Sequence, residues 1–353
     1  MSTAPSLPFA RAPSLPECER PRAVASWLLA CCALVLAIVV VGGVTRLTHS
    51  GLSIVEWQPI VGAVPPLTAA DWEATFDLYK KTPEFRLRNF DIDVEGFKGI
   101  FWWEYAHRLL GRLVGVAFAL PFFWFLARGR VRGKLAWKLA GILALGAAQG
   151  AMGWYMVKSG LVDEPRVSQL RLAAHLGLAF LVFGAQFALA LALLDPPRRE
   201  AAPIAGVHGM ARLFVVLTFL MVLSGALVAG LRAGLAYNTF PLMHGQVVPP
   251  DMWLLEPRAA NFLGNIATVQ FDHRMIAWAM AAFAAALWWR VTRDPALARA
   301  HASAHLLAAA ITVQFALGVA TLLLVVPLPL AVAHQAWALV VFSAAIALAH
   351  RLR

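Results

Sequence analysis

Residues 23–44 have the sequence AVASWLLACCALVLAIVVVGGV, an apolar run that contains no charged side chain. About 20 such residues, at roughly 1.5 Å each, are needed for an α-helix to cross about 30 Å of membrane hydrocarbon. Seven further, mostly apolar runs follow at residues 106–126, 135–157, 172–194, 213–230, 271–289, 304–326 and 331–349. The sequence therefore predicts an all-α polytopic membrane protein with eight transmembrane helices.

The composition of the whole chain agrees with this prediction. Of its 353 residues, 60% are hydrophobic and 14% are charged, whereas soluble domains average roughly 45–50% apolar and about 25% charged residues. The apolar content excludes a disordered protein. Three cysteines in so long a chain exclude a disulfide scaffold.

The basic residues are concentrated in the connections on one side of the predicted membrane. These connections hold 16 Lys and Arg residues and 5 Asp and Glu residues, so this side carries the whole net charge of +11. Such an excess marks the cytoplasmic side of a membrane protein and places both termini there. Topology and contact with lipid head groups account for the charge, with no nucleic-acid partner.

The chain contains an internal repeat. His107-Arg108 recurs as His273-Arg274, Ala174-His175 as Ala333-His334, Gly42 as Gly225, and Gln149 with Gly153 as Gln314 with Gly318. Two four-helix halves are predicted. Because four helices return the chain to its starting side, both halves have the same orientation and form a parallel repeat.

The repeat divides the chain into four parts. These are a cytoplasmic N-terminal tail, an N-terminal half, a cytoplasmic linker and a C-terminal half, at residues 1–22, 23–195, 196–212 and 213–353. The N-terminal half includes the longest extracytoplasmic loop, residues 47–99. The indole rings of Trp57, Trp72, Trp102 and Trp103 predict a partly helical cap at the membrane interface.

Four of the ten histidines share one depth. His107, His175, His273 and His334 each lie early in a helix that enters from the outer side, and they form two repeat-related pairs. A lone histidine in a membrane helix is often a hydrogen-bond partner between helices. Two facing imidazoles can instead ligate the iron of a haem that lies between helices of a bundle. Pairing within each half is expected, with His107 and His273 across the two halves as the alternative.

Other residues near the histidines suit a flat ligand. Zinc is less suitable, since its tetrahedral sites draw on Cys or carboxylate side chains that these positions lack. Small residues leave room at Gly111, Gly115, Gly146, Gly150, Gly177 and Gly225, although glycine also serves helix packing. Arg108 and Arg274 follow their histidines and could bind haem propionates, or extend to the outer head groups instead.

The two halves differ three residues before their first histidine. Glu104 precedes His107 on the same helix face, and Gln270 occupies the equivalent place before His273. A carboxylate can move a proton or stabilise a developing cation, which an amide cannot. The alternative role of Glu104 is an ion pair with Arg108. The second half does contain a carboxylate, Asp272, on a different face of its helix, and this weakens the contrast between the two halves.

Three motifs resemble the haem A synthase family in its alphaproteobacterial and mitochondrial form. They are Glu-x-x-His-Arg-x-x-Gly-Arg at residues 104–112, GVTRLTHSGLSIVEWQP at residues 43–59, and Phe-Asp-His-Arg at residues 271–274. The resemblance extends from about residue 27 to residue 350. The chain lacks the cysteine pair that another form of the family carries in its first outer loop.

The resemblance implies a reaction. Two successive hydroxylations would oxidise the methyl group at ring carbon 8 of haem O to the formyl group of haem A, which serves cytochrome c oxidase. By the matching motifs, His107 and His175 would hold the substrate haem, with Glu104 as the catalytic carboxylate. His273 and His334 would hold a haem b cofactor, with iron ligated at all four histidines.

The resemblance also implies a cellular setting. The protein would lie in the bacterial inner membrane with its haem sites toward the periplasm, and it would meet haem O synthase and oxidase assembly factors. Homo-oligomerisation is a further alternative. Two other functions compete on the residues alone: a bis-His electron-transfer cytochrome b, which leaves its haems unaltered, and a haem carrier. A purely structural subunit is disfavoured, because buried ionisable groups are costly in a membrane.

Overall fold

The computed structural model describes residues 18–58, 61–162, 165–196 and 205–353. Within these residues, eight helices are long and apolar enough to cross a membrane, which confirms the predicted all-helical architecture. They are α1 (Pro21–Leu47), α4 (Val94–Ala127), α5 (Gly133–Lys158), α6 (Gln169–Leu194), α7 (Ala205–Gly230), α9 (Ile266–Arg293), α10 (His301–Leu323) and α11 (Leu328–Arg351).

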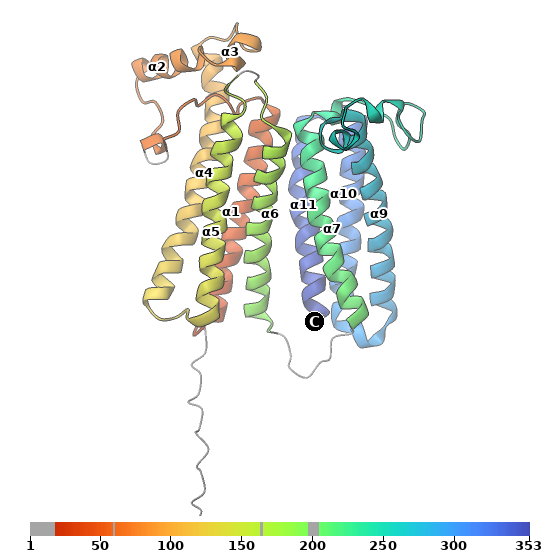
Figure 1. Cartoon of the computed structure of the whole chain (residues 1–353). Coiled ribbons are helices and arrows are strands. Elements are labelled where there is room, and N and C mark those ends of the chain that lie inside the picture. Colours follow the sequence, from red (N-terminus) through yellow and green to blue (C-terminus); the bar gives the residue numbers. More distant parts are fainter. Residues whose placement is uncertain (1–17, 59–60, 163–164, 197–204) are drawn as a thin grey trace, which may run out of the picture.

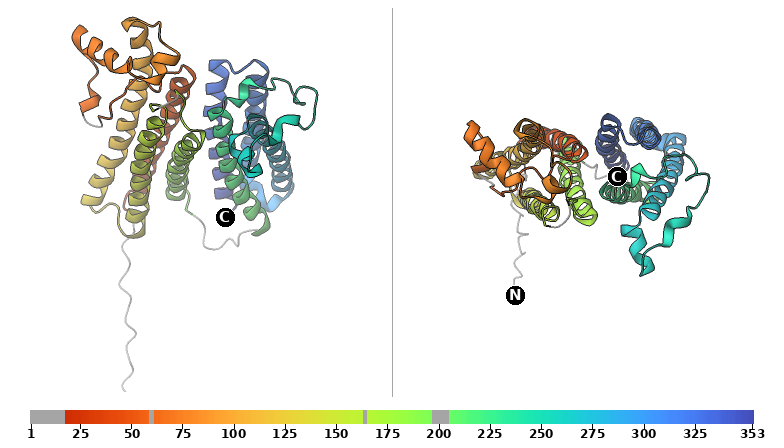
Figure 2. Two further views of the ribbon diagram at one scale, coloured as in Figure 1. Left: turned by 45° about the horizontal axis from the view of Figure 1, so that its top comes forward. Right: turned by 90° about the horizontal axis from the view of Figure 1, so that it is seen from above.

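The long helices form two bundles of four that stand side by side (Figures 1 and 2). In the first bundle, α1 and α5 each pack against both α4 and α6. In the second bundle, α7 and α10 each pack against both α9 and α11. The helices of each bundle therefore form a closed ring, in which α4 faces α6 and α9 faces α11 across the centre.

The two bundles meet through α1 and α6 on one side and α7 and α11 on the other. A buried apolar cluster fills this interface and includes Val35, Phe180 and Phe342. A Cβ atom at Gly184 would lie 2.8 Å from the ring of Phe342. Glycine at this position therefore allows α6 and α11 to approach each other closely.

Capping residues set the starts of several helices at the end of the molecule opposite the start of α1 and the end of α11, which is called the outer end below (Figure 1). Asp93 accepts a hydrogen bond from the backbone N–H of Gly96 and begins α4 at Val94. Helix α4 therefore starts inside the range 47–99 that was expected to be loop, and Trp102 and Trp103 belong to this helix. Hydropathy located only its membrane-embedded part, because the first three turns of α4 project beyond the apolar run.

The outer end of the first bundle carries a helical cap (Figure 1). It contains the helix α2 (Ala69–Tyr79), which Thr68 and Asp71 cap reciprocally, and the short helix α3 (Pro83–Leu87). An aromatic cluster that includes Phe76 and Phe97 packs the cap onto α4. The partly helical character that was predicted for this loop is thus confirmed, while its place at the membrane interface stays a prediction. A short 3₁₀ segment, η1 (Val61–Ala63), precedes α2.

The outer connections of the second bundle are different. They contain η2 (Ala233–Leu235), η3 (Pro250–Trp253), η4 (Arg258–Ala260) and the short helix α8 (Asn261–Gly264). At the opposite end of the molecule, η5 (Pro295–Ala300) leads into α10. Only short helical segments were found in the outer connections of this half within the described part of the chain.

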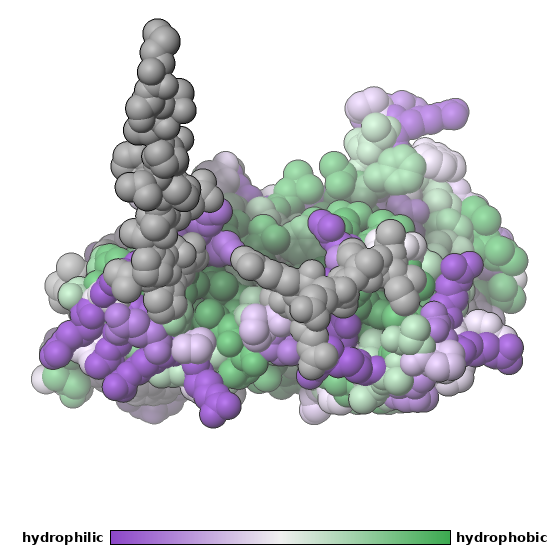
Figure 3. Space-filling model, turned by 90° about the horizontal axis from the view of Figure 1, so that it is seen from below, coloured by the Kyte–Doolittle hydropathy of each residue, from purple (hydrophilic) through white to green (hydrophobic). Residues whose placement is uncertain are grey.

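The start of α1 and the end of α11 lie at the same end of the molecule (Figure 1). Arg351 donates a hydrogen bond of 2.6 Å to Asp195 there, which joins the ends of α11 and α6. Hydrophilic residues line the rim of this end, with hydrophobic residues between them (Figure 3). Residues 1–17 of the predicted tail and 197–204 of the predicted linker lie outside the described residues.

Candidate functional site

The four predicted histidines occupy four different helices. His107 is on α4 and His175 on α6, while His273 is on α9 and His334 on α11. Because α4 faces α6 and α9 faces α11, each pair stands on diagonal helices of one bundle. His107 interacts electrostatically with His175, and His273 with His334. The structure thus brings together the two histidines of each half.

Each histidine ring lies against a glycine of a neighbouring helix. The pairs are Gly42 with His107, Gly153 with His175, Gly225 with His273, and Gly318 with His334. A Cβ atom would lie 2.9 Å from the ring at Gly42, Gly153 and Gly318, and 3.2 Å at Gly225. Any larger residue would therefore displace the ring, so these glycines determine where the imidazoles lie.

Most of the glycines that the sequence indicated for this role lie elsewhere. A Cβ atom at Gly115, Gly146 or Gly150 would meet nothing within 4 Å, and one at Gly177 would meet Leu223. Only Gly225 of that set contacts a histidine ring. Helical spacing alone does not identify the partner helix. The signal that could have found the other three was the repeat itself, which aligns Gly42 with Gly225 and Gly153 with Gly318.

Polar side chains orient three of the four rings. Gln149 Nε2 lies 3.5 Å from His175 Nε2, and Gln314 Nε2 lies 3.3 Å from His334 Nδ1. Ser224 Oγ lies 3.2 Å from His273 Nδ1. Sequence reasoning recognised the two glutamines as repeat-related but missed these contacts. Their equivalence extends the similarity of the two halves to the side chains next to the histidines.

Glu104 is buried beside the first pair, with 2% of its surface exposed. Its Oε2 accepts hydrogen bonds from Ser53 Oγ at 2.7 Å and from the backbone N–H of Ile54 at 2.8 Å. Its Oε1 accepts from Arg108, through Nε at 3.0 Å and one terminal nitrogen at 2.7 Å. The expected ion pair of Glu104 with Arg108 is therefore present, and four donors hold the carboxylate.

Arg108 also holds the chain that follows α1. Its terminal nitrogens donate to the backbone oxygens of Ile54 at 2.6 Å and Glu56 at 3.0 Å. The guanidinium thus joins the carboxylate of Glu104 to the loop above it. Five planar donors in a fixed fork suit this bridging role.

The second half has an equivalent set of contacts between a helix side chain, an arginine and a loop, but the direction of the hydrogen bonds to the loop is reversed. Gln270, with 3% of its surface exposed, donates from Nε2 to the backbone oxygens of Ala233 at 2.7 Å and Ala236 at 2.6 Å. Its Oε1 accepts from Arg274 at 3.0 Å. Arg274 also donates to the backbone oxygens of Tyr237 at 2.6 Å and Thr239 at 2.9 Å. An amide therefore stands where the first half has a carboxylate.

Several buried polar atoms around the histidines have no partner in the protein. They are His175 Nδ1, Gln149 Oε1, Gln314 Oε1 and Arg274 Nε. Buried polar groups normally form hydrogen bonds, so unpaired ones mark places where a bound group is expected. Within the described part of the chain, no three His, Cys, Asp or Glu side chains gather around a point that could hold a bare metal ion.

A haem fits this donor set. Its porphyrin supplies four nitrogen ligands to the iron, so the protein needs to supply only two axial ligands, and each half offers one diagonal pair of imidazoles. Each imidazole lies against a glycine of a neighbouring helix, and the missing side chain of that glycine leaves space for the ring. Arg274 Nε offers one buried donor for a carboxylate.

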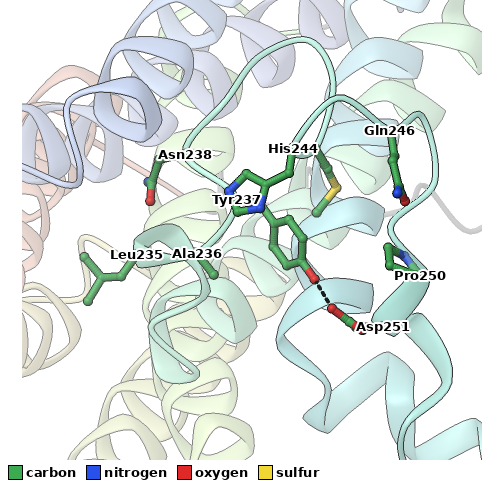
Figure 4. A pocket seen from close by; sticks show the side chains of 9 residues that line it. Leu235, Ala236, Tyr237, Asn238, His244, Gln246, Pro250 and Asp251 are labelled. Carbon is green, nitrogen blue, oxygen red and sulfur yellow. Dashed lines mark hydrogen bonds between the residues drawn. The ribbon is translucent and has the colours of Figure 1, made fainter.

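A surface pocket lies in the outer connections of the second half (Figure 4). The rings of Tyr237 and His244 contact each other in it, tilted by 40° with their centroids 4.9 Å apart, and the hydroxyl of Tyr237 donates to Asp251 at 2.7 Å. The backbone oxygen of Tyr237 accepts from Arg274. The pocket is thus connected to Arg274 through Tyr237, but none of the four helix histidines lines it.

Comparisons with known proteins bear on the whole chain. Residues 25–346 match the family described as "Cytochrome oxidase assembly protein". The chain is 55% identical to "Heme A synthase" of Nitrosospira multiformis over 332 residues, which cover 94% of this chain and 93% of that protein. It is 51% identical to "Heme A synthase" of Nitrosomonas eutropha, with 93% of each chain covered.

Alphaproteobacterial proteins are also similar. The chain is 47% identical to "Heme A synthase" of Rhodospirillum centenum over 333 residues, which cover 94% of this chain and 89% of that protein. The similar proteins thus come from both alphaproteobacteria and betaproteobacteria. All three matches extend over nearly the whole chain.

Proposed function

This chain belongs to the haem A synthase family, and on that premise we propose that its two halves hold haems with different roles. It is an oxidoreductase of haem A biosynthesis, with haem O as substrate and haem A as product. In our proposal, His107 and His175 hold haem O in the first half. His273 and His334 hold a haem b cofactor in the second half.

The proposed reaction converts the methyl group at ring carbon 8 of haem O to a formyl group by two successive hydroxylations. Glu104 acts as the catalytic carboxylate, which accepts a proton or stabilises positive charge at the methyl carbon. Its four hydrogen bonds hold it in place, and its burial excludes bulk water. The haem b, when bound, supplies one-electron redox chemistry.

The two arginines have unequal parts in this proposal. Arg274 Nε is buried without a protein partner and binds a haem propionate of the cofactor. Arg108 forms an ion pair with Glu104 and bridges it to the loop that follows α1. A propionate contact at Arg108 would use the donor capacity that these bonds leave.

The proposal includes a membrane orientation. The end of the molecule that carries the two helix termini faces the cytoplasm, because basic residues gather in its connections. The haem sites then lie toward the periplasmic side of the bacterial inner membrane, and the halves form a parallel repeat. Membrane lipid surrounds the bundles, and haem O synthase, oxidase assembly factors and a second copy of the chain are proposed protein contacts.

One observation carries this assignment most strongly: the halves share diagonal histidines and their glycines, yet a buried carboxylate stands beside one pair alone. The test is haem extraction and chromatography from protein expressed with and without a source of haem O. We expect haem b in both samples, and haem O with haem A only when haem O is supplied.

A different result would favour another function. If haem b alone were found in both samples, an electron-transfer cytochrome would replace the synthase, and Glu104 would have no catalytic role. If radiolabelled haem exchanged through the protein without chemical change, a haem carrier would be favoured.

A further inference from the structure

The cap of the first half contains a buried carboxyl group with no role in the proposed reaction. Glu84 lies in the first turn of α3, which Thr82 caps by accepting from the backbone N–H of Phe85. Glu84 has 2% of its surface exposed. Its Oε2 is buried and has no hydrogen-bond partner. A buried oxygen without a donor is unusual and calls for an explanation.

The cap brings this carboxyl group close to the site of the first half. Glu84 and Glu104 interact electrostatically, although 19 positions separate them in the chain. The fully buried ring of Tyr79 interacts with both carboxyl groups. The hydroxyl of Tyr79 accepts from Asn89 Nδ2 at 2.7 Å, so its own hydrogen is free to be donated.

The charged groups around Glu84 come from both halves. Burial is the main cause, and the negative charge of Glu104 the second, that raise the pKa of Glu84 from 4.5 to about 7. Arg88, which follows α3, and Arg232, which follows α7, lower the pKa. The balance allows Glu84 to gain or lose a proton near neutral pH.

The carboxylate oxygens of Glu104 are already occupied as hydrogen-bond acceptors. Each of its two oxygens already accepts two hydrogen bonds, and the donors include the permanently charged Arg108. A proton on Glu104 would remove an acceptor from one of these donors. A second group that relieves Glu104 of the proton would therefore restore its hydrogen bonds.

We propose that Glu84 takes up protons from Glu104 and passes them to the outer aqueous phase. The inference rests on the proposed function, because it assumes that Glu104 receives a proton during haem A formation. In the proposed step an O–H bond at Glu104 breaks, one forms at Glu84, and that bond breaks when water takes the proton. No electron moves in this step, and Glu84 acts through Glu104 rather than on the haem.

The test is the pH profile of haem A formation for the full-length protein and for Glu84→Gln. Haem A and haem O are extracted and quantified at a series of pH values on either side of 7. The ionised form of Glu84 is the acceptor, so the wild-type rate should rise with pH through about 7. Glu84→Gln should lower the rate about tenfold and remove this rise.

The control is Glu73→Gln, which changes an exposed carboxyl group of α2 in the same cap. It should leave the rate and the pH profile unchanged. Tyr79→Phe removes a hydroxyl that interacts electrostatically with both carboxyl groups and should lower the rate while the rise near pH 7 persists. Each comparison is made at equal haem content per protein, so that a folding defect is not counted as a slower reaction.

The outcomes separate this proposal from the function on which it rests. If Glu84→Gln made haem A at the wild-type rate with an unchanged pH profile, Glu84 would have no part in proton transfer, and the proposed function would stand. If Glu84→Gln lost rate but kept the wild-type profile, its role would be structural, which also overturns the proposal. If the wild-type protein itself formed no haem A from haem O, the proposed function would fail first.

Discussion

The two four-helix halves hold their histidines in the same way but surround them with opposite hydrogen-bond polarity. In the first half, the loop after α1 donates two hydrogen bonds to the carboxylate of Glu104. In the second half, the loop after α7 presents two backbone oxygens to the amide of Gln270. Arg108 joins α4 to the loop after α1, and Arg274 joins α9 to the equivalent loop after α7.

The two halves therefore differ in the loop that contacts this position as well as in the residue itself, Glu104 or Gln270. A loop that offers donors stabilises an anion, and a loop that offers acceptors repels one. The first half is therefore built around a negative charge, and the second half around a neutral amide. Five predictions test this contrast, from the largest expected effect to the smallest.

Removing a histidine from one half should cause the loss of the haem of that half alone. His107→Ala should lose haem O and haem A while keeping haem b, and His273→Ala should lose haem b, because each would remove one of the two proposed iron ligands of its haem. Extraction and chromatography measure both. His305→Ala, at a histidine that Trp288 contacts outside the bundle centre, is the control and should keep every haem. Loss of the same haem from both variants would contradict the division of roles.

Glu104→Gln should abolish haem A formation while both haems stay bound. The amide cannot take a proton, and the contribution of such a group is at least about 100-fold in rate. The haem A to haem O ratio in the extract measures the effect. Haem A at the normal rate would remove Glu104 from the reaction.

The free energy of unfolding should depend on pH through Glu84, in the cap of the first half. The folded-state pKa of Glu84 is raised to about 7 from 4.5, so its contribution to stability is fully present below 4.5 and lost as the pH rises through 7. The free energy of unfolding should fall by about 3 kcal/mol across that range. Thermal unfolding at both ends of the range measures this.

Two variants check the source of that pH dependence. Glu84→Gln should remove most of the fall in stability, because its side chain does not titrate. Glu73→Gln should keep the full fall. An identical pH dependence in wild type and Glu84→Gln would show that other groups cause it.

Gln270→Glu should destabilise the second half by about 1–3 kcal/mol, because a carboxylate would then face the backbone oxygens of Ala233 and Ala236. Arg274 remains beside it and limits the loss. Thermal unfolding of the haem-loaded protein measures the effect. An increase in stability would show that the polarity of the loop does not select the residue.

The glycine contacts predict a smaller and graded effect. Gly42→Ala places a Cβ atom 2.9 Å from the ring of His107, and Gly225→Ala places one 3.2 Å from the ring of His273. The first substitution should shift the haem absorption spectrum more than the second, at a cost in stability of about 1 kcal/mol. Gly115→Ala, where a Cβ atom meets nothing within 4 Å, is the control.

The sequence alone determined much of this protein. The eight spans followed from apolar runs, because a helix that crosses the hydrocarbon needs a mostly apolar run of sufficient length. The four histidines and the Glu104 to Gln270 difference followed from the repeat, which is visible as the same residues in the same order in both halves. Both kinds of signal are local or periodic, and neither requires knowledge of which helices touch.

Only the tertiary structure decided what surrounds these residues. The diagonal placement of His107 and His175 depends on the ring order of the helices, and two of the four donors to Glu104 come from a loop about 50 positions away. Likewise, the burial of Glu84 near Glu104 depends on how the cap folds onto α4. Hydrogen-bond polarity and desolvation depend on neighbours that the folded chain brings together, and no local pattern in the sequence records them.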